Sequence, residues 1–203
     1  MHLAILTKAP FPGYAKTRLM PLLGTRGAQQ AHKRLAANTL NLGRHSGLSR
    51  VSLWASDLHP FFNRYLRGSR VEMHRQCQGD LGERMTQAFL HRPTEPTIVI
   101  GTDCPVLTTT LLSEAAHRLL TSDLLTYPAE DGGFVLIGAA NPATVPFAKL
   151  FNNVQWGGEA VLKQLEGNIR AYQNSDPCVR YTRGATLWDV DTPEDYQRWQ
   201  QTA

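Results

Sequence analysis

Cysteine is scarce in this chain of 203 residues, which holds three: Cys77, Cys104 and Cys178. An odd number of widely spaced thiols argues against a disulfide framework and against a cysteine-based zinc site. Such thiols are typical of proteins kept in a reducing compartment, so we expect a cytoplasmic protein. A chain of this length buries enough apolar surface to need neither disulfides nor a structural metal.

Long apolar runs are missing as well. The most hydrophobic stretch, residues 132–151, is interrupted by polar residues and by Pro142 and Pro146, and the chain reaches Lys8 without a signal-peptide core. We therefore expect neither a membrane span nor export. The 16 glycines and 12 prolines are scattered and no repeat occurs, which excludes collagen, coiled coils and intrinsic disorder. The composition predicts a single domain over residues 1–203.

Acidic residues are rare in the first part of the chain. Residues 1–75 hold twelve Lys and Arg against two Asp and Glu, whereas residues 76–203 hold nine against fifteen. A basic segment can attract phosphate and an acidic one can hold a divalent cation; the alternative is two solvated faces that offset each other. The arginines are spread over several elements without a recognised binding motif, so we expect no nucleic-acid partner.

Strand-like and helix-like patterns alternate through the first 120 residues. Short apolar runs predict strands at residues 2–7, 51–55, 71–75, 97–100, 124–127, 134–137, 169–172 and 186–190. Helical spacing predicts helices at 27–45, 61–67, 80–91, 111–120, 160–165 and after Pro193, with a loop at 8–26. The alternation predicts a mostly parallel sheet with helices on both faces.

The loops after the first and fourth strands are the places where we expect chemistry. Ligands of such sheets bind beyond the carboxyl ends of the strands, where the strand order reverses, and this point commonly lies between those two strands. The first loop holds three cations, a hydroxyl and a flexible glycine: Lys8, Lys16, Arg18, Thr17 and Gly13. This set is suited to phosphate. It is no Walker A loop, because Ala15 precedes Lys16. The alternative is a solvated basic loop.

Carboxylates at strand ends are candidates for binding Mg²⁺ or Mn²⁺. Asp103 follows the fourth predicted strand within Gly-Thr-Asp-Cys-Pro, and Asp191 follows the predicted strand at 186–190. Carboxylate oxygens are the ligands that these hard cations prefer, and two separated carboxylates bind better than one. The alternative for Asp103 is a turn or a helix cap. Thr192 and Asp195 are expected to cap the last helix.

Two further acidic turns each have a structural and a functional interpretation. Asp131 lies in Pro-Ala-Glu-Asp-Gly-Gly, where the glycines allow close approach of a ligand but Asp-Gly is equally a turn signal. Asp80 and Glu83 lie beside Gly79 and Gly82 near the expected cleft, yet their spacing is also that of a capping box.

Other chemistries find little support. The sequence has no Gly-x-Ser-x-Gly, His-Glu-x-x-His, Cys-x-x-Cys or Gly-x-Gly-x-x-Gly motif. Its seven histidines lack the spacing of metal ligands, so we expect each to be a surface or core residue. Trp156 is expected to pack in the core rather than stack on a ligand.

Five motifs together resemble the radical-SAM/selenodomain-associated transferase family, whose members are usually described as glycosyltransferases. The motifs are Lys-Ala-Pro-x-Pro-Gly-x-x-Lys-Thr-Arg-Leu at 8–19, Gly-Asp-Leu-Gly-Glu-Arg-Met at 79–85, Gly-Thr-Asp-Cys-Pro at 101–105, Pro-Ala-Glu-Asp-Gly-Gly-Phe at 128–134 and Asp-Val-Asp-Thr-Pro-Glu-Asp at 189–195. The resemblance covers nearly the whole chain. It implies the GT-A fold of nucleotide-diphospho-sugar transferases, a three-layer α/β/α sandwich with a mostly parallel mixed sheet.

The same fold serves nucleotidyltransferases, including guanylyltransferases and sugar-acid cytidylyltransferases. The motif at 189–195 is similar to that of the cytidylyltransferases, and their metal-binding aspartate matches Asp191. The sequence departs from many nucleotidyltransferases in lacking a Leu-x-Gly-Gly loop, whose place is taken by residues 8–19. The Lys-x-Arg-Leu pattern there looks nearer to the phospholactate guanylyltransferases.

The leading hypothesis is a metal-dependent transferase with a nucleotide-diphosphate sugar as donor and a small-molecule acceptor. The expected catalytic residues are Lys16, Arg18, Asp103 and Asp131, the last as base for the acceptor hydroxyl; the expected metal ligands for Mg²⁺ or Mn²⁺ are Asp103 and Asp191. The expected nucleotide and phosphate contacts are Lys8, Pro10, Gly13, Lys16, Thr17, Arg18, Gly79, Asp80, Gly82, Arg84 and Thr102. The alternatives are a nucleotidyltransferase that attacks the α-phosphate of a nucleoside triphosphate, and a noncatalytic nucleotide-binding module. The sequence indicates no base, sugar, acceptor or oligomeric state.

Overall fold

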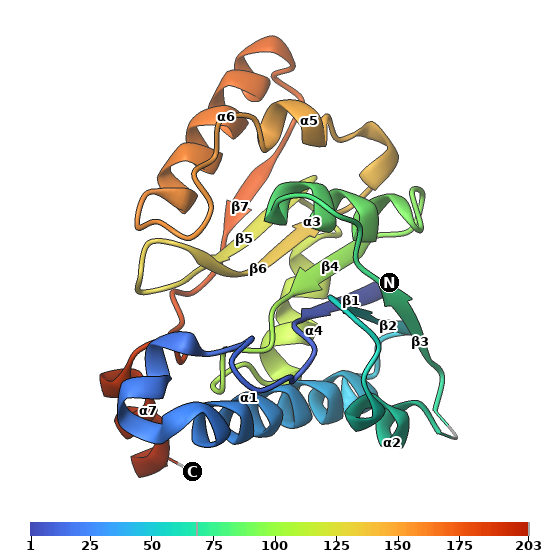
Figure 1. The fold of residues 1–203 in the computed structure, drawn as a ribbon. Coiled ribbons are helices and arrows are strands. Elements are labelled where there is room, and N and C mark those ends of the chain that lie inside the picture. The colour runs from blue at the N-terminus through green and yellow to red at the C-terminus, as the bar shows by residue number, and fades with distance from the viewer. Residues whose placement is uncertain (68, 203) are drawn as a thin grey trace.

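The computed structural model describes residues 1–67 and 69–202 and shows an α/β fold around one mixed, mostly parallel sheet (Figure 1). The seven strands lie in the order β3-β2-β1-β4-β6-β5-β7. They are β1 (His2–Thr7), β2 (Arg50–Ala55), β3 (Val71–Arg75), β4 (Thr97–Ile100), β5 (Leu124–Pro128), β6 (Phe134–Ala139) and β7 (Tyr181–Arg183). β6 runs antiparallel to both β4 and β5, and the other pairs are parallel.

Seven α-helices connect and cover the strands in the described part of the chain. They are α1 (Met20–His45), α2 (Asn63–Leu66), α3 (Leu81–Leu90), α4 (Thr109–Arg118), α5 (Phe147–Leu150), α6 (Val161–Ser175) and α7 (Pro193–Thr202). Short 3₁₀ turns precede three of them, η1 (Thr17–Leu19), η2 (Pro60–Phe62) and η3 (Pro142–Thr144). Within the described residues, none of the helices combines the length and the apolarity that a membrane crossing requires.

The helices form a layer on each face of the sheet, as Figure 1 shows. Alternation along the fully buried strand β1 decides which face each side chain joins. Leu3 and Ile5 belong to a core shared with α1, α2 and α4. Ala4 and Leu6 belong to a second core shared with α3, α5 and α6. The strand order β3-β2-β1-β4 confirms the predicted reversal point between β1 and β4.

A third, smaller core fixes the end of the chain against its beginning. Trp188, Val190 and Trp199 from the C-terminal segment pack with Leu19 and Leu35 from η1 and α1. Apolar burial therefore brings the segment before α7 next to the loop that follows β1.

Two predicted strands are wrong. Residues 169–172 lie inside α6, because Ile169 is one of a helically spaced apolar set that faces the sheet. Residues 186–190 form no strand; Leu187 makes an isolated bridge to Ala129, and the strand that pairs with β5 is β7 instead. The loop predicted at 8–26 is also too long, since α1 begins at Met20 and contains a break at Gly24, with φ 66.

Candidate functional site

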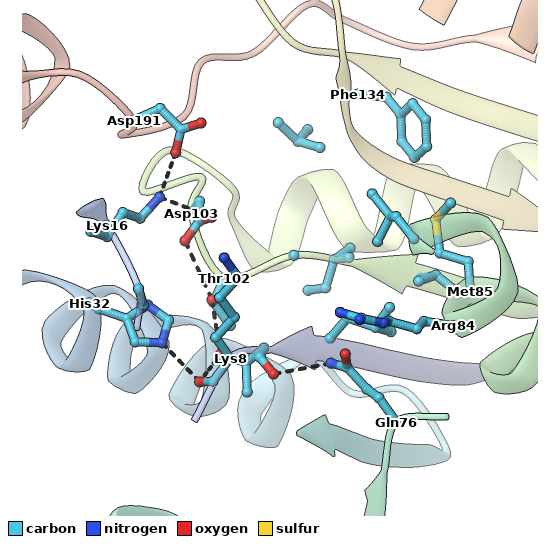
Figure 2. A pocket seen from close by; sticks show the side chains of 18 of the residues that line it. Lys8, Lys16, His32, Gln76, Arg84, Met85, Thr102, Asp103, Phe134 and Asp191 are labelled. Carbon is cyan, nitrogen blue, oxygen red and sulfur yellow. Dashed lines mark hydrogen bonds and ion pairs between the residues drawn. The ribbon is translucent and has the colours of Figure 1, made fainter. Parts of the chain in front are cut away.

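A cavity of about 420 Å³ opens at the carboxyl ends of β1 and β4, where the strand order reverses (Figure 2). Its volume is in the range of small-molecule sites in proteins. The lining combines cations, carboxylates and apolar side chains: Leu6, Thr7, Lys8, Ala15, Lys16, Thr17, Arg18, His32, Gln76, Leu81, Arg84, Met85, Val99, Ile100, Gly101, Thr102, Asp103, Phe134, Val135 and Asp191. The loops after β1 and β4 therefore meet as predicted.

Lys16 lies between two carboxylates at one end of the cavity. Its Nζ is 2.9 Å from Asp103 Oδ2 and 2.7 Å from Asp191 Oδ1, and its side chain is only 5% exposed (Figure 2). Burial alone would lower the pKa of Lys16, but the two carboxylates outweigh burial and raise that pKa. Burial would raise the pKa of Asp103, but the ammonium group of Lys16 holds that pKa below its usual value. Both groups therefore stay charged.

Main-chain contacts bring the C-terminal segment to this end of the cavity. Leu187 N–H donates to Pro128 O at 2.9 Å, which attaches the segment beyond β5. Val190 N–H donates to Asp103 O at 2.9 Å, which attaches it beyond β4. These two contacts place Asp191 beside Lys16, although 175 residues separate them in sequence.

A second group of carboxylates adjoins the ion pairs. Asp131, Asp189 and Asp191 each offer one oxygen, and these oxygens lie within 4.8 Å of one another. Burial first, and then the charges of Asp131 and Asp191, raise the pKa of Asp189 to about 7. Such crowding of negative charge is unfavourable in the free protein and is relieved by a cation.

This donor set fits a hard divalent cation such as Mg²⁺ or Mn²⁺. All three groups are carboxylates, and their oxygens lie close enough together to share one cation. Asp191 belongs both to this cluster and to the ion pair with Lys16, so it connects the metal-binding candidates to the cavity. Asp189 had no role assigned from the sequence; its position two residues before Asp191 was the available signal.

The other end of the cavity is largely apolar. Figure 2 shows Met85 and Phe134 there, with Arg84 and Gln76 beside them. Gln76 Nε2 donates to Thr7 O at 3.0 Å and to Trp54 O at 2.7 Å, which ties together the ends of β1 and β2. The Nε of Arg84 is buried and has no hydrogen-bond partner among the described residues. This end can accept a flat, partly apolar group with a polar edge.

His32 is a lining residue that sequence reasoning missed, because an isolated histidine in a helix resembles a core residue. Its Nε2 lies 2.9 Å from Lys8 O. Burial lowers the pKa of His32, so the ring supports the loop after β1 mainly as a neutral group. Thr7 and Thr102 bridge the ends of β1 and β4 through their hydroxyl oxygens, 3.2 Å apart.

The structure brings together about half of the residues expected at the site. The ones that line the cavity are Lys8, Lys16, Thr17, Arg18, Arg84, Thr102, Asp103 and Asp191. The ones that do not line it are Pro10, Gly13, Gly79, Asp80, Gly82 and Asp131. Asp131 lies instead in the carboxylate group described above.

Several of the residues outside the lining have local structural roles. Asp80 and Glu83 form the predicted capping box at the start of α3. Asp131 Oδ1 accepts a hydrogen bond from Gly133 N–H at 2.8 Å, which confirms the turn there. Thr192 and Asp195 cap α7 reciprocally, as expected.

Comparison with known proteins places the chain in a family. A family model described as "Uncharacterized protein conserved in bacteria (DUF2064)" matches residues 27–158, well over half of the chain. The chain belongs to the DUF2064 family. No curated protein matches the sequence.

Solved structures show the same fold as this DUF2064 chain. One is a "putative nucleotide-diphospho-sugar transferase" from Desulfovibrio desulfuricans G20. It is 22% identical in sequence with a TM-score of 0.84, and the match covers 99% of this chain and 87% of the transferase chain. A second is Rv0371C of Mycobacterium tuberculosis H37Rv in complex with manganese; it is 16% identical with a TM-score of 0.52, and the match covers 100% of this chain and 99% of that one. A third is a CMP:2-keto-3-deoxy-manno-octonic acid synthetase complexed with CTP; it is 12% identical with a TM-score of 0.53, and the match covers 100% of this chain and 98% of that one.

These similarities confirm the predicted fold class, that of nucleotide-diphospho-sugar transferases and nucleotidyltransferases. At such identities they show the fold of this DUF2064 chain, while its reaction has to be argued from its own site. Its resemblance to the radical-SAM/selenodomain-associated transferases stays a prediction.

Proposed function

We propose that this DUF2064 protein is a metal-dependent transferase that uses a nucleoside-diphosphate sugar as donor. The observation that carries the proposal is the position of Lys16 between Asp103 and Asp191 in one cavity. A buried ammonium group flanked by carboxylates is a place where phosphate oxygens and a divalent cation can both be bound. The match to a transferase of the same fold supports the substrate class.

The basic residues would bind and neutralise the diphosphate. Lys8, Lys16 and Arg18 line the same cavity, so a diphosphate bound there could contact all three cations. In glycosyl transfer negative charge grows on the departing diphosphate, and fixed cations stabilise that charge more in the transition state than in the ground state. Thr17 adds a hydroxyl donor in the same loop.

The acidic residues would hold Mg²⁺ or Mn²⁺. Asp191 and Asp103 remain the proposed ligands, and Asp189 is a further carboxylate beside Asp191. When bound, the cation supplies Lewis-acid stabilisation of the diphosphate. Manganese in a distant structure of the same fold supports this choice of metal.

The apolar end of the cavity would bind the nucleoside. Met85 and Phe134 offer apolar surface, and the buried, unpartnered Nε of Arg84 offers a donor that a nucleotide can satisfy. Contacts from Gly79, Asp80 and Gly82 remain proposals, since these residues border the start of α3 outside the lining. The same holds for Pro10 and Gly13 in the loop after β1.

Asp131 remains the proposed base for the acceptor hydroxyl. Its side chain is exposed and one of its oxygens accepts from Gly133, which fixes the carboxylate beside Asp189 and Asp191. Fixed in this way, the carboxylate can accept a proton from an acceptor that enters from solvent.

A nucleotidyltransferase is the second candidate. The cations that line the cavity, Lys8, Lys16 and Arg18, would bind the phosphates of a nucleoside triphosphate as they would those of a nucleotide sugar. In that reaction an acceptor oxygen bonds to the α-phosphorus and pyrophosphate leaves with the electron pair. The fold match to a synthetase complexed with CTP supports this reading.

Product analysis separates the two reactions. The protein is incubated with Mn²⁺, a panel of acceptor alcohols and either nucleoside triphosphates or nucleotide sugars, and the release of pyrophosphate or of nucleoside diphosphate is measured. The proposal predicts nucleoside diphosphate from a nucleotide sugar, at a rate abolished in Asp191→Asn. Pyrophosphate release would favour the second candidate. If neither product forms while nucleotides still raise the melting temperature, the protein is a noncatalytic nucleotide-binding module.

A further inference from the structure

A cluster of two histidines and a glutamate lies apart from the cavity, on β3 and the end of α3. Glu72 and His74 are two residues apart on edge strand β3 and so share one face of the sheet. His91 is the C-cap residue of α3. Each of the three offers one ligand atom, and these atoms lie within 4.8 Å of one another.

Both imidazole rings direct a nitrogen at the same carboxylate oxygen. His74 Nε2 is 3.6 Å and His91 Nε2 is 3.5 Å from Glu72 Oε2. His74 Nε2 is shielded from solvent and has no hydrogen-bond partner among the described residues. An unsatisfied buried ring nitrogen is costly, and coordination of a cation would satisfy it.

Neighbouring side chains hold the cluster in this arrangement. Trp54 stacks on His74 with ring centroids 4.5 Å apart, and Trp54 Nε1 is itself fixed by a 2.8 Å bond to Ser52 Oγ. Arg92 donates to Glu72 Oε1 at 2.7 Å and also reaches Oε2 at 3.0 Å. Glu72 can therefore keep its contact with Arg92 through Oε1 while Oε2 faces the two rings.

We propose that Glu72, His74 and His91 form a second metal site, which binds one transition-metal cation of the Zn²⁺ class. Two imidazoles and a carboxylate are the donor set that Zn²⁺, Co²⁺ and Ni²⁺ prefer, whereas Mg²⁺ and Mn²⁺ favour all-oxygen sets such as the carboxylates of the cavity.

The site would connect two elements that shape the cavity. β3 leads directly into Gln76, and α3 carries Leu81, Arg84 and Met85, all of which line the cavity. A cation held by Glu72 and His74 on β3 and by His91 at the end of α3 joins these elements. A cation that binds the folded state but not the unfolded chain therefore stabilises the protein, and with it the apolar end of the cavity. This inference does not depend on the proposed transfer reaction.

Calorimetry with Zn²⁺ on the tag-free, metal-free full chain tests the site. The variants are His91→Ala and the isosteric Glu72→Gln, and the matched control is His117→Ala, which removes an exposed histidine of α4. We expect wild type and control to bind one equivalent of Zn²⁺ and both cluster variants to bind it at least about 10-fold more weakly. The melting temperature should rise with Zn²⁺ in wild type and control but not in the cluster variants.

Two further measurements identify the ligand type and show that the variants fold. Co²⁺ substitution should give a spectrum without thiolate charge-transfer bands, because the ligands are nitrogen and oxygen. Unchanged metal-free melting of His91→Ala and Glu72→Gln would show that both variants fold. The proposal is overturned if both variants bind Zn²⁺ as wild type does, if wild type binds none, or if binding is lost only in Asp191→Asn.

Discussion

Lys16 adopts a left-handed backbone conformation, with φ 53 and ψ 43, directly before η1. A side chain other than glycine rarely takes this conformation, which costs on the order of 1 kcal/mol. The two ion pairs to Asp103 and Asp191 offset that cost and direct the ammonium group into the cavity. Strain at a residue that lines a cavity is typical of functional sites.

Replacement of Lys16 by methionine tests this charge balance. We expect Lys16→Met to lower the free energy of unfolding by about 2 kcal/mol, between the values of exposed and buried ion pairs, because Asp103 and Asp191 are themselves 40% and 37% exposed. The pKa of Asp103 is lowered in the folded state, so the stabilisation is complete above its unfolded pKa and is lost as pH falls through the folded pKa. Urea unfolding from neutral to acid pH measures both effects.

The control for this variant is Lys163→Met, which removes an exposed lysine from α6. Its stability should stay within about 0.5 kcal/mol of wild type. Equal effects of the two substitutions would contradict the assigned role of Lys16.

Asp189 is expected to make the stability of the fold depend on pH in the opposite direction. Its pKa is raised to about 7, so folding takes up a proton between the unfolded pKa near 4 and this value, and stability falls as pH rises through that range. We expect Asp189→Asn to be more stable than wild type by about 2 kcal/mol near pH 8 without metal, after allowance for solvent screening, and equally stable near pH 4. Thermal unfolding across this pH range checks the sign. A less stable variant at alkaline pH would show that the crowding of carboxylates is not unfavourable.

The segment from Leu187 to the start of α7 decides the geometry of the acidic cluster. The Asp195 side chain accepts hydrogen bonds from the main-chain N–H groups of Asp191 and Thr192, at 3.1 and 2.8 Å. The helix cap therefore also fixes the backbone of a proposed metal ligand. This contact links the stability of α7 to the shape of the site.

Removal of this cap should affect both stability and metal binding. We expect Asp195→Ala to lower the free energy of unfolding by about 1 kcal/mol, and to weaken Mn²⁺ binding because Asp191 loses its fixed position. Glu194→Ala is the matched control, since Glu194 is exposed in the same first turn. Calorimetric titration with Mn²⁺ measures the effect. If Asp195→Ala is destabilised but binds Mn²⁺ as wild type does, the helix cap does not position Asp191 for metal binding.

Most elements were predictable because their patterns are local. The alternation of Leu3, Ala4, Ile5 and Leu6 between two cores, and the capping box of α3, follow directly from residue spacing. The end of the sheet was not predictable in this way. The apolar run at 186–190 looks like a strand, but its Trp188 and Val190 are buried against α1, and a short polar segment, β7, pairs with β5.

The order of the strands in the sheet brings the basic and acidic parts of the sequence together. β1 and β4 are neighbours, so the loops that carry Lys16 and Asp103 meet at one edge, which the sequence pattern predicted. The contributions of His32 and Gln76 were not predictable, because they depend on long-range packing of α1 and β3. The cluster of Glu72, His74 and His91 likewise joins residues with no motif spacing.

Calorimetric titration of nucleotides, with and without Mn²⁺, into wild type, Asp103→Ala and the control Asp123→Ala tests the role of Asp103; Asp123 lies directly before β5. We expect Mn²⁺-dependent binding of a nucleoside diphosphate or its sugar to wild type and control, and loss of that binding in Asp103→Ala. Unchanged Mn²⁺-dependent nucleotide binding by folded Asp103→Ala would contradict this expectation.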